Sequence, residues 1–167
     1  KKLYCVIPAR GGSKRIKNKN IVMFNKKPLI YYSINAAKKT NLFKKIIVST
    51  DSSRIKHLSE KFGAVVPFKR AKNISDDKSS SIDVLKNIIK KINIKDDYIF
   101  FLYPTSPNIN KEDLINDLKK IKKEKADCLI AVKEYESNPL RSMVLDKNKK
   151  FLKFKFKKYQ KKNSQEL

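Results

Sequence analysis

Apolar runs of strand length alternate with amphipathic segments of helix length along most of this chain, and that order restricts its fold. The run Leu3–Pro8 is followed by helix-type spacing over 28–40, with Pro28 suited to a first turn. Strands joined through helices are typical of parallel sheets, so we predict an α/β fold with a mostly parallel central sheet and helices on both faces. The strand-type runs are 3–8, 44–52, 64–68, 98–104 and 127–133, and the helix-type segments are 28–40, 54–62, 79–92 and 112–123.

The helix-type segments carry recognisable end signals. Asp51 or Ser52 can cap the helix over 54–62, and Gly63 can end it because glycine tolerates a left-handed backbone. The last segment, 112–123, is amphipathic, and its position along the chain predicts a helix that covers the sheet. Its apolar stripe consists of Leu114, Ile115, Leu118 and Ile121.

Length and composition fit one globular domain. With 167 residues, 40% of them hydrophobic, the chain can bury a real apolar core. No apolar run approaches the ~20 residues of a membrane-spanning helix, so we expect a cytoplasmic protein with no membrane partner. Cys5 and Cys128 lack C-x-x-C spacing and are interpreted as reduced thiols packed in apolar runs. His57 has no second histidine with which to bind a metal and is interpreted as a surface or partly buried side chain.

The excess of positive charge is carried by lysine. The chain has 41 lysines and arginines against 16 acidic residues, a formal net charge of +25, and such a field attracts phosphate polymers. Nucleic-acid interfaces favour arginine, whose planar fork binds bidentately, yet only five of these cations are arginines. We interpret the lysines as solvated faces and expect no specific nucleic-acid partner. The arginines are Arg10, Arg15, Arg54, Arg70 and Arg141.

Polar segments follow several of the strand-type runs. "ARGGSKR" comes after the first run, "STDS" ends the second, and "YPTSP" ends the run at 98–104. A further polar segment, "FKRAKNISDD", lies in the middle of the chain. In an open α/β sheet, ligands bind beyond the carboxyl ends of the strands. We therefore expect these four segments to converge on one edge of the sheet and form a binding site.

The stretch VIPARGGSKRIKNKN, residues 6–20, has groups that suit a polyphosphate. Gly11 and Gly12 let backbone N–H groups approach a ligand with no Cβ in the way, and Ser13 adds a hydroxyl. The patterns G-x-x-x-x-G-K-[ST] and G-x-G-x-x-G are absent, so the stretch by itself fits a lysine-rich surface loop about as well. Its cations and amides are Arg10, Lys14, Arg15, Lys19, Asn18 and Asn20.

Seven segments taken in order give a more specific signal than this stretch. They are "IPARGGSKRIKNKNI", "KPLI", "SINAA", "IIVSTDS", "GAVVPFKR", "SDDKSSSIDV" and "LYPTSP". Over about residues 5 to 145 they resemble the cytidylyltransferases that activate nonulosonic acids, the CMP-sialic acid synthetase group. "SKRI", Tyr103 before "PTSP" and the ending "NSQEL" are most similar to the pseudaminic acid branch. The resemblance implies a three-layer, Rossmann-like nucleotidyltransferase (GT-A-like) fold.

The resemblance also implies a reaction: CTP and an acidic nine-carbon sugar, pseudaminate as first choice, give the CMP-sugar and pyrophosphate, with Mg²⁺ as cofactor. Arg10 and Lys19, by motif position, would be catalytic and stabilise charge on the phosphate oxygens. Such an enzyme is expected to form a homodimer. The implied nucleotide-binding residues are Ala9, Arg10, Gly11, Gly12, Ser13, Lys19, Asn20, Arg70, Ser79 and Ser80. The residues implied to border the sugar are Tyr103, Pro104, Thr105, Ser106 and Arg141.

The resembling family normally continues with a segment like D-A-G-Q-x-Y, which supplies acidic metal ligands. This chain reaches Leu167 without it, so we expect a single nucleotidyltransferase domain over 1–167, truncated at the C-terminus, with the Mg²⁺ ligands beyond Leu167. Asp76 and Asp77 are the nearby carboxylates inside the chain. We interpret them as caps of the helix that begins near Ser79 in preference to metal ligands.

Three functions remain open from the sequence. The chain can be the cytidylyltransferase, a CTP-binding but catalytically deficient fragment of one, or a basic nucleic-acid-binding protein that has charge but no recognisable motif. Structural alternatives also exist for single residues: Asp51 can be a helix cap, and Thr105 and Ser106 can shape a rigid turn between prolines. Arg141 can be a surface cation, although its place in a proline-led loop favours a phosphate or carboxylate partner.

Overall fold

The computed structural model describes residues 2–13, 16–75, 79–95, 98–134, 139–145, 148 and 152–160, in two units, Lys1–Asp127 and Cys128–Leu167. The strands are β1 (Leu3–Pro8), β2 (Met23–Phe24), β3 (Lys27–Pro28), β4 (Lys45–Ser49), β5 (Tyr98–Phe101), β6 (Met143–Leu145) and β7 (Leu152–Phe154). The α-helices are α1 (Leu29–Lys39), α2 (Ser53–Lys61), α3 (Ser81–Ile92) and α4 (Lys111–Lys123). Short 3-10 helices are η1 (Lys19–Ile21), η2 (Lys72–Ile74), η3 (Pro139–Arg141) and η4 (Lys157–Tyr159).

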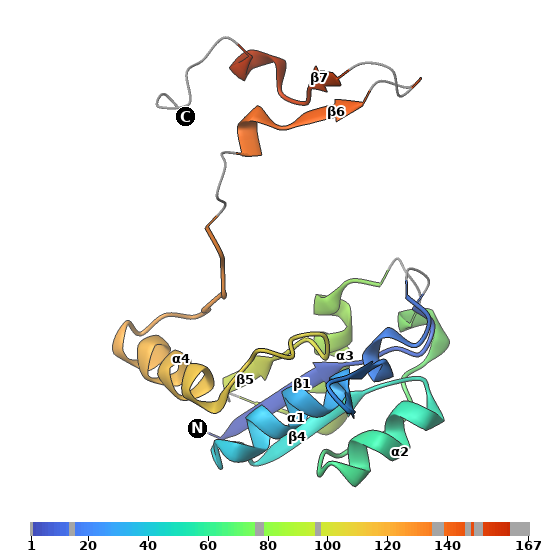
Figure 1. Ribbon diagram of the computed structural model, residues 1–167. Helices are drawn as coiled ribbons and strands as arrows, with labels where there is room; N and C mark the ends of the chain where they lie inside the picture. The colour runs from blue at the N-terminus through green and yellow to red at the C-terminus, as the bar shows by residue number, and fades with distance from the viewer. Residues whose placement is uncertain are drawn as a thin grey trace. The chain divides into compact units, whose positions relative to one another are not determined.

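A parallel sheet forms the centre of the first unit, with its three strands in the order β4-β1-β5 (Figure 1). Cys5 in β1 lies opposite Ile46 in β4 and Phe100 in β5. The middle of β1 is fully buried on both faces, as expected for a parallel sheet that helices cover on each side. The predicted α/β architecture with a parallel central sheet is confirmed.

Two apolar cores cover the two faces of this sheet. The larger core joins α1, α2 and α4 to one face, where Ile34 and Leu114 are almost fully buried. The smaller core packs α3 on the opposite face through Ile88, against Val6 and Ile47. Each such side chain stabilises the fold by ~2 kcal/mol through removal of apolar surface from water. In Figure 1, α1 and α3 accordingly lie on opposite sides of β1, which gives the three layers that the sequence predicts.

The first turn of α2 is capped by Ser52 rather than by Asp51. The Oγ of Ser52 accepts the N–H of Ile55 at 3.4 Å, which satisfies one of the free donors at the helix start. Gly63 follows the helix with a φ of 96°, in the left-handed region that favours glycine. Of the two capping residues that the sequence left open, the structure selects Ser52 and leaves the Asp51 carboxylate for another contact.

The start of α3 is held by a capping box. Ser80 Oγ accepts the backbone N–H of Asp83 at 3.1 Å, and the Asp83 carboxylate accepts the backbone N–H of Ser80 at 3.1 Å. The alternative in which Asp76 or Asp77 caps this helix is therefore wrong, because a residue nearer the helix already fills that role. Asp76 and Asp77 themselves lie outside the described residues.

The capping box predicts a pH-dependent stability. Hydrogen bonds from the Ser80 hydroxyl and then from its backbone hold the pKa of Asp83 below the ordinary value of 3.8. A lowered carboxyl pKa stabilises the fold above the unfolded-state pKa and stops doing so as pH falls through the folded-state pKa. We expect Asp83→Asn to lower the Tm at neutral pH, and the gap from wild type to close below pH 3.8. Thermal unfolding over a pH series measures this, and a gap that stays constant would contradict it.

The apolar run 64–68 does not form the predicted strand. Val65 makes one isolated parallel bridge beside β4: its N–H donates to the Ile46 carbonyl at 2.8 Å, and its carbonyl accepts the Val48 N–H at 2.9 Å. Two residues later stands Pro67, which has no N–H to donate, so the ladder stops. The sheet is extended at this edge by one residue instead of a strand.

The predicted strand over 127–133 is also wrong. These residues belong to no sheet, and the side chains of Ile130 and Val132 are 75% and 88% exposed. A strand exists only where a neighbour accepts its hydrogen bonds, and within the described part of the chain no segment pairs with this one. Cys128 is consequently exposed, whereas Cys5 is buried as predicted, and burial raises the pKa of the Cys5 thiol far above its ordinary value.

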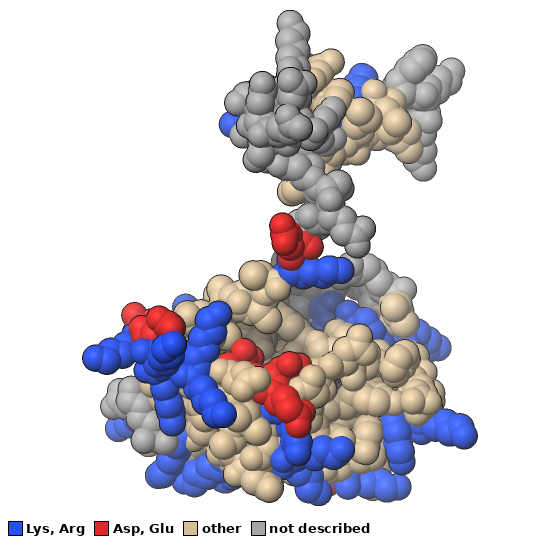
Figure 2. Space-filling view, turned by 60° about the vertical axis from the view of Figure 1, so that its left-hand side comes forward, with Lys and Arg blue, Asp and Glu red and all other residues tan. Residues whose placement is uncertain are grey.

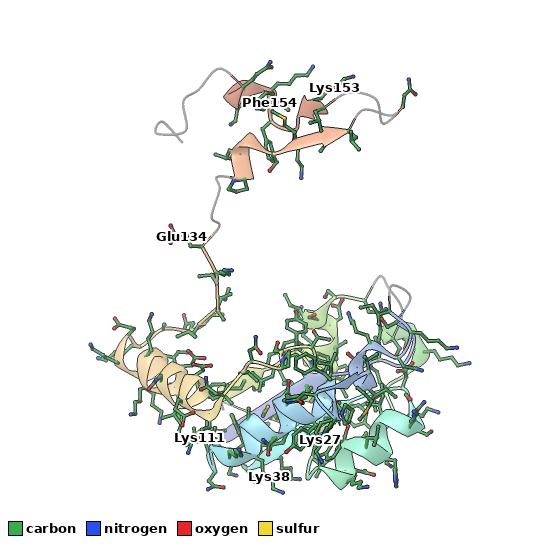
Figure 3. All side chains as sticks on the ribbon, viewed as in Figure 1. Lys27, Lys38, Lys111, Glu134, Lys153 and Phe154 are labelled. Atoms are coloured by element: carbon green, nitrogen blue, oxygen red, sulfur yellow. The ribbon has the colours of Figure 1, made fainter. Side chains whose placement is uncertain are left out.

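The second unit contains an antiparallel hairpin of β6 and β7. Met143 lies opposite Phe154, and Leu145 lies opposite Leu152. Figure 3 labels two neighbouring side chains of β7, Lys153 and Phe154. Neither strand was predicted, because each has only three residues and too few positions to show a period.

Charged side chains of the first unit lie on its surface. Lys38 in α1 and Lys111 in α4 are exposed and lie at the periphery of the unit (Figure 3). Figure 2 shows lysine and arginine side chains spread over the viewed face, with aspartate and glutamate among them, instead of one basic stripe. His57 is exposed as well. Among the described helices, none is both long and apolar enough to cross a bilayer.

Candidate functional site

A cavity of about 300 Å³ lies at the carboxyl edge of the sheet in the first unit. The ends of β1 and β5, the start of α3 and the loop that carries Arg70 meet around it. Parallel strands end at one edge, so segments far apart in the sequence come together there, as predicted. The candidate residues that line this cavity are Arg10, Ser13, Lys19, Asn20, Arg70, Ser79, Ser80, Tyr103, Pro104 and Thr105.

Arg10 and Lys19 reach the cavity because their two segments are tied together. Asn18 has a left-handed backbone, with a φ of 54°, and turns the chain into the 3-10 helix η1. Asn20 in this helix is 5% exposed, and its Nδ2 donates to the carbonyl oxygen of Arg10 at 2.8 Å. The two cations are thus held on the same cavity by a buried amide, whose Oδ1 is left as an acceptor.

Gly11 and Gly12 differ in what surrounds them. A Cβ on Gly11 would lie 3.0 Å from the Cβ of Ser52, so a side chain there requires the loop after β1 or the turn after β4 to shift. The N–H of Gly11 donates to Asp51 Oδ1 at 2.8 Å, and Ser13 N–H donates to the Gly11 carbonyl at 3.0 Å. A Cβ on Gly12 would meet nothing within 4 Å. Gly11 is therefore tightly packed, whereas the position of Gly12 has room for a side chain.

This difference predicts opposite effects for two alanine substitutions. We expect Gly11→Ala to lower the free energy of unfolding by ~1–2 kcal/mol, because the Ser52 turn must shift to admit the methyl group. We expect Gly12→Ala to change that free energy by less than ~0.5 kcal/mol, because the site is open. Urea unfolding of both variants measures the difference, and equal losses would contradict it.

Arg70 is the most unusual side chain of the site. It is only 5% exposed, and its Nε and Nη2 have no hydrogen-bond partner among the described residues. Burial lowers the pKa of its guanidinium; the Asp51 carboxylate opposes this change, and the positive charge of Arg10 adds to it. A buried guanidinium with unpaired donors costs stability, so the arrangement favours a ligand with acceptor atoms.

Hydroxyl groups and an aromatic ring also line the cavity. Tyr103 is 52% exposed, its carbonyl accepts the hydroxyl of the buried Ser33 in α1 at 2.8 Å, and its own hydroxyl lies 3.0 Å from Ser81 Oγ. Its ring and that of Phe101 form a T-shaped pair, with centroids 5.6 Å apart. In the capping box the Ser80 N–H donates to the Asp83 carboxylate and the Asp83 N–H donates to Ser80 Oγ, so these two donors are not available to an anion. Hydroxyl groups therefore line this cavity together with the cations.

Some candidate residues lie elsewhere. Ala9 is fully buried in the larger core, and its N–H donates to the Ser49 carbonyl at 2.9 Å. Ser106 is half-buried and is not part of the lining, and neither Gly11 nor Gly12 is. Arg141 belongs to η3, which is part of the second unit. Lys14 and Arg15, two of the proposed loop cations, lie outside the described residues.

Sequence reasoning missed four lining residues, and each had a signal. Pro8 ends β1 and Ser81 begins α3, and each lies directly beside a residue that the sequence analysis had assigned to nucleotide binding. Ile74 and Val84 supply the apolar part of the wall, as ligand cavities generally require. Ile74 follows Arg70 in the same polar segment, and Val84 lies one turn into a helix whose start was already assigned to the site.

Comparison with known proteins agrees with the motif order. The family model described as Cytidylyltransferase matches residues 4–166. The pseudaminic acid cytidylyltransferase of Campylobacter jejuni is 40% identical over 166 residues, which are 98% of this chain and 71% of that protein. The N-acylneuraminate cytidylyltransferase of Escherichia coli is 37% identical over 134 residues, covering 78% of this chain and 31% of that protein.

A solved structure shares the fold. CMP:2-keto-3-deoxy-manno-octonic acid synthetase complexed with CTP superposes with a TM-score of 0.63 and 26% identity, covering 75% of this chain and 49% of that one. This chain thus spans about half the length of that synthetase and most of the Campylobacter relative. The family match extends over nearly every residue, and the resemblance seen in the motifs is confirmed. The chain belongs to the cytidylyltransferase family.

Proposed function

We propose that this chain binds CTP in the cavity and transfers CMP to an acidic nonulosonic sugar, with pseudaminate as first choice, releasing pyrophosphate. Support comes from the identity to a pseudaminic acid cytidylyltransferase and from the likeness to a synthetase that was solved with CTP. The observation in the site that carries the proposal is Arg70. Its buried guanidinium has two unpaired donors beside a cavity that Arg10 and Lys19 also line.

The unpaired donors of Arg70 suit cytosine. Nε–H and Nη2–H lie on one edge of the guanidinium and match two adjacent acceptors, as O2 and N3 of cytosine are. Uracil carries a hydrogen on N3, so its N3–H donor would face an N–H donor of Arg70. A buried site strongly rejects a ligand that leaves its donors unpaired in this way. We assign the base to Arg70 and a ribose hydroxyl to the free Oδ1 of Asn20. Guanine also presents two adjacent acceptors, O6 and N7, whereas adenine presents an acceptor beside a donor.

The cations at the cavity suit the chemistry of the α-phosphate. In the proposed reaction the anomeric oxygen of the sugar forms a bond to the α-phosphorus, while the bond from that phosphorus to the bridging oxygen breaks and pyrophosphate leaves. Negative charge develops on the phosphate oxygens, and fixed positive groups lower the barrier because they need no reorganisation. Arg10, held through its carbonyl by Asn20, and Lys19 in η1 are the two groups placed for this role.

Magnesium stays a prediction for this chain. Mg²⁺ is usually bound by one or two carboxylates together with substrate phosphates. The described residues contain no group of three acidic, histidine or cysteine side chains that could hold a metal, and no described carboxylate lines the cavity. The described residues therefore do not form a complete Mg²⁺ site, and the roles proposed for Arg10, Lys19 and Arg70 do not depend on the ion. Pyrophosphate release with and without a chelator tests the requirement.

A nucleotide titration tests the proposed function. CTP should raise the Tm, because a ligand that binds only the folded state stabilises it, by ~2.7 kcal/mol at a hundred times its Kd. UTP, ATP and GTP should protect much less at physiological salt. Equal protection by all four would leave only diffuse attraction to a basic protein, and protection by DNA alone would support the nucleic-acid alternative.

Turnover is a separate measurement from binding. Pyrophosphate release with pseudaminate, legionaminate, N-acetylneuraminate and Kdo identifies the sugar, and binding of CTP without release would support the catalytically deficient alternative. We also propose a homodimer, which light scattering tests directly. A cytoplasmic location stays a prediction.

A further inference from the structure

The turn after β4 contains a carboxylate with a contact that neither helix capping nor ligand binding explains. Asp51 Oδ1 accepts the N–H of Gly11 at 2.8 Å, across 40 residues of sequence. Asp51 is half-buried, does not line the cavity, and leaves the cap of α2 to Ser52. Its carboxylate joins the turn after β4 to the loop after β1.

Neighbouring backbone contacts make this turn a support for both arginine-bearing segments. The Ser49 carbonyl accepts the N–H of Ala9 at 2.9 Å, and the Thr50 carbonyl accepts the N–H of Arg70 at 2.8 Å. Within the turn, Thr50 Oγ1 accepts the N–H of Ser52 at 3.1 Å, which fixes its shape. Three consecutive residues, Ser49 to Asp51, therefore hold the backbone on either side of Arg10 and at Arg70.

The contact to Gly11 is the member of this set that a side chain provides. The other two come from carbonyl oxygens, which every residue has, so no substitution removes them directly. The Asp51 contact is also a charge-assisted one, and such bonds are about twice as strong as neutral ones. The charge of Asp51 acts on Arg70 as well, because it opposes the lowering of the guanidinium pKa by burial and by Arg10. Asp51 is thus the residue of this turn whose contact with the loop after β1 can be removed by substitution of a side chain.

We infer that Asp51 is a positioning residue: it holds the Gly11 amide, and through it the loop of Arg10 to Ser13, in the conformation that binds the triphosphate, without touching the nucleotide. This inference rests on the proposed function for the identity of the ligand. It assigns the acidic residue of the "STDS" segment to loop geometry instead of to helix capping or metal binding. The loop geometry in turn sets where the Arg10 side chain and the open space at Gly12 meet the phosphates.

Three variants of the full chain test this inference. Asp51→Ala removes the acceptor, Asp51→Asn keeps an oxygen at the same position without charge, and Ser52→Ala removes the neighbouring helix cap while leaving the Gly11 contact in place. Isothermal titration gives the Kd for CTP and for cytidine, and hydrogen exchange gives the protection of the Gly11 amide. Thermal unfolding in the absence of ligand gives the stability of each variant.

We expect Asp51→Ala to expose the Gly11 amide to exchange and to weaken CTP binding about tenfold, while cytidine binding changes less than about twofold. Asp51→Asn should restore Gly11 protection and return the Kd for CTP to within about threefold of wild type. Ser52→Ala should lower the Tm but leave both Kd values and the Gly11 amide as in wild type. This split between CTP and cytidine distinguishes positioning from a general loss of stability.

Two results would overturn the inference. One is a loss of CTP affinity that follows the loss of Tm equally in Asp51→Ala and Ser52→Ala, which would show a purely structural role. The other is an Asp51→Asn variant that restores protection of the Gly11 amide but binds CTP as weakly as Asp51→Ala, which would show that charge matters and the hydrogen bond does not. If wild type fails to bind CTP, the proposed function fails, and exchange at Gly11 still decides whether Asp51 holds the loop.

Discussion

Arg70→Met should lose most of its CTP affinity while the ligand-free protein keeps or gains stability. The guanidinium of Arg70 is buried and two of its donors are unpaired, so a methionine of similar length removes a costly group from the fold. Hydrogen bonds from a charged donor pair to a ligand are worth ~3 kcal/mol, so the Kd for CTP should rise about a hundredfold. Titration calorimetry and ligand-free thermal unfolding measure the two effects.

The matched control for this variant is Arg54→Met. Arg54 is exposed in α2, so this change removes the same charge from the protein without touching the cavity. It should leave the Kd for CTP within about twofold of wild type at physiological salt, because exposed charges are screened. Arg70→Lys adds a second comparison: lysine keeps the charge without the planar fork, and should lose discrimination between CTP and UTP. A fall in ligand-free Tm in Arg70→Met would show that the guanidinium is a structural partner.

Lys19→Ala should lose about a hundredfold in turnover, whereas Lys17→Ala should stay within about twofold of wild type. Lys19 lines the cavity, where its position is fixed by η1, and Lys17 is exposed two residues earlier in the same loop. Removal of one preorganised charge contact costs ~3 kcal/mol of transition-state stabilisation. The measurement is pyrophosphate release with saturating CTP and sugar.

The pair of lysine variants also separates specific from diffuse charge. Both substitutions lower the net charge by the same amount, so any effect of the overall field on nucleotide binding is common to them. Similar losses in both variants would mean that the loop acts through its general positive charge, and the role assigned to Lys19 would be withdrawn. If the chain binds CTP without releasing pyrophosphate, the Kd for CTP replaces turnover, and the order of the two variants should be the same.

The sequence by itself determined the elements whose signals are local. The apolar run of β1, the period of α1 and α4, and the left-handed Gly63 after α2 need only neighbouring residues to be recognised, and each was predicted. It also indicated three of the segments that line the cavity, because the carboxyl ends of parallel strands meet at one edge; the fourth, "STDS", lies beside the loop after β1 without lining the cavity. The order of the motifs indicated the family, and the resemblance to that family singled out Arg10, Lys19 and Arg70.

Only the tertiary structure decided the roles that depend on residues distant in sequence. The run 127–133 has the composition of a strand, but strand formation needs a hydrogen-bonding neighbour that sequence does not display. Asp51 and Ser52 are both good caps, and the N–H of Gly11 across the loop determines which one is free to cap. The unpaired donors of Arg70 exist because its backbone is held at Thr50 while the surrounding fold buries its guanidinium. These are contacts between segments, and no local pattern encodes them.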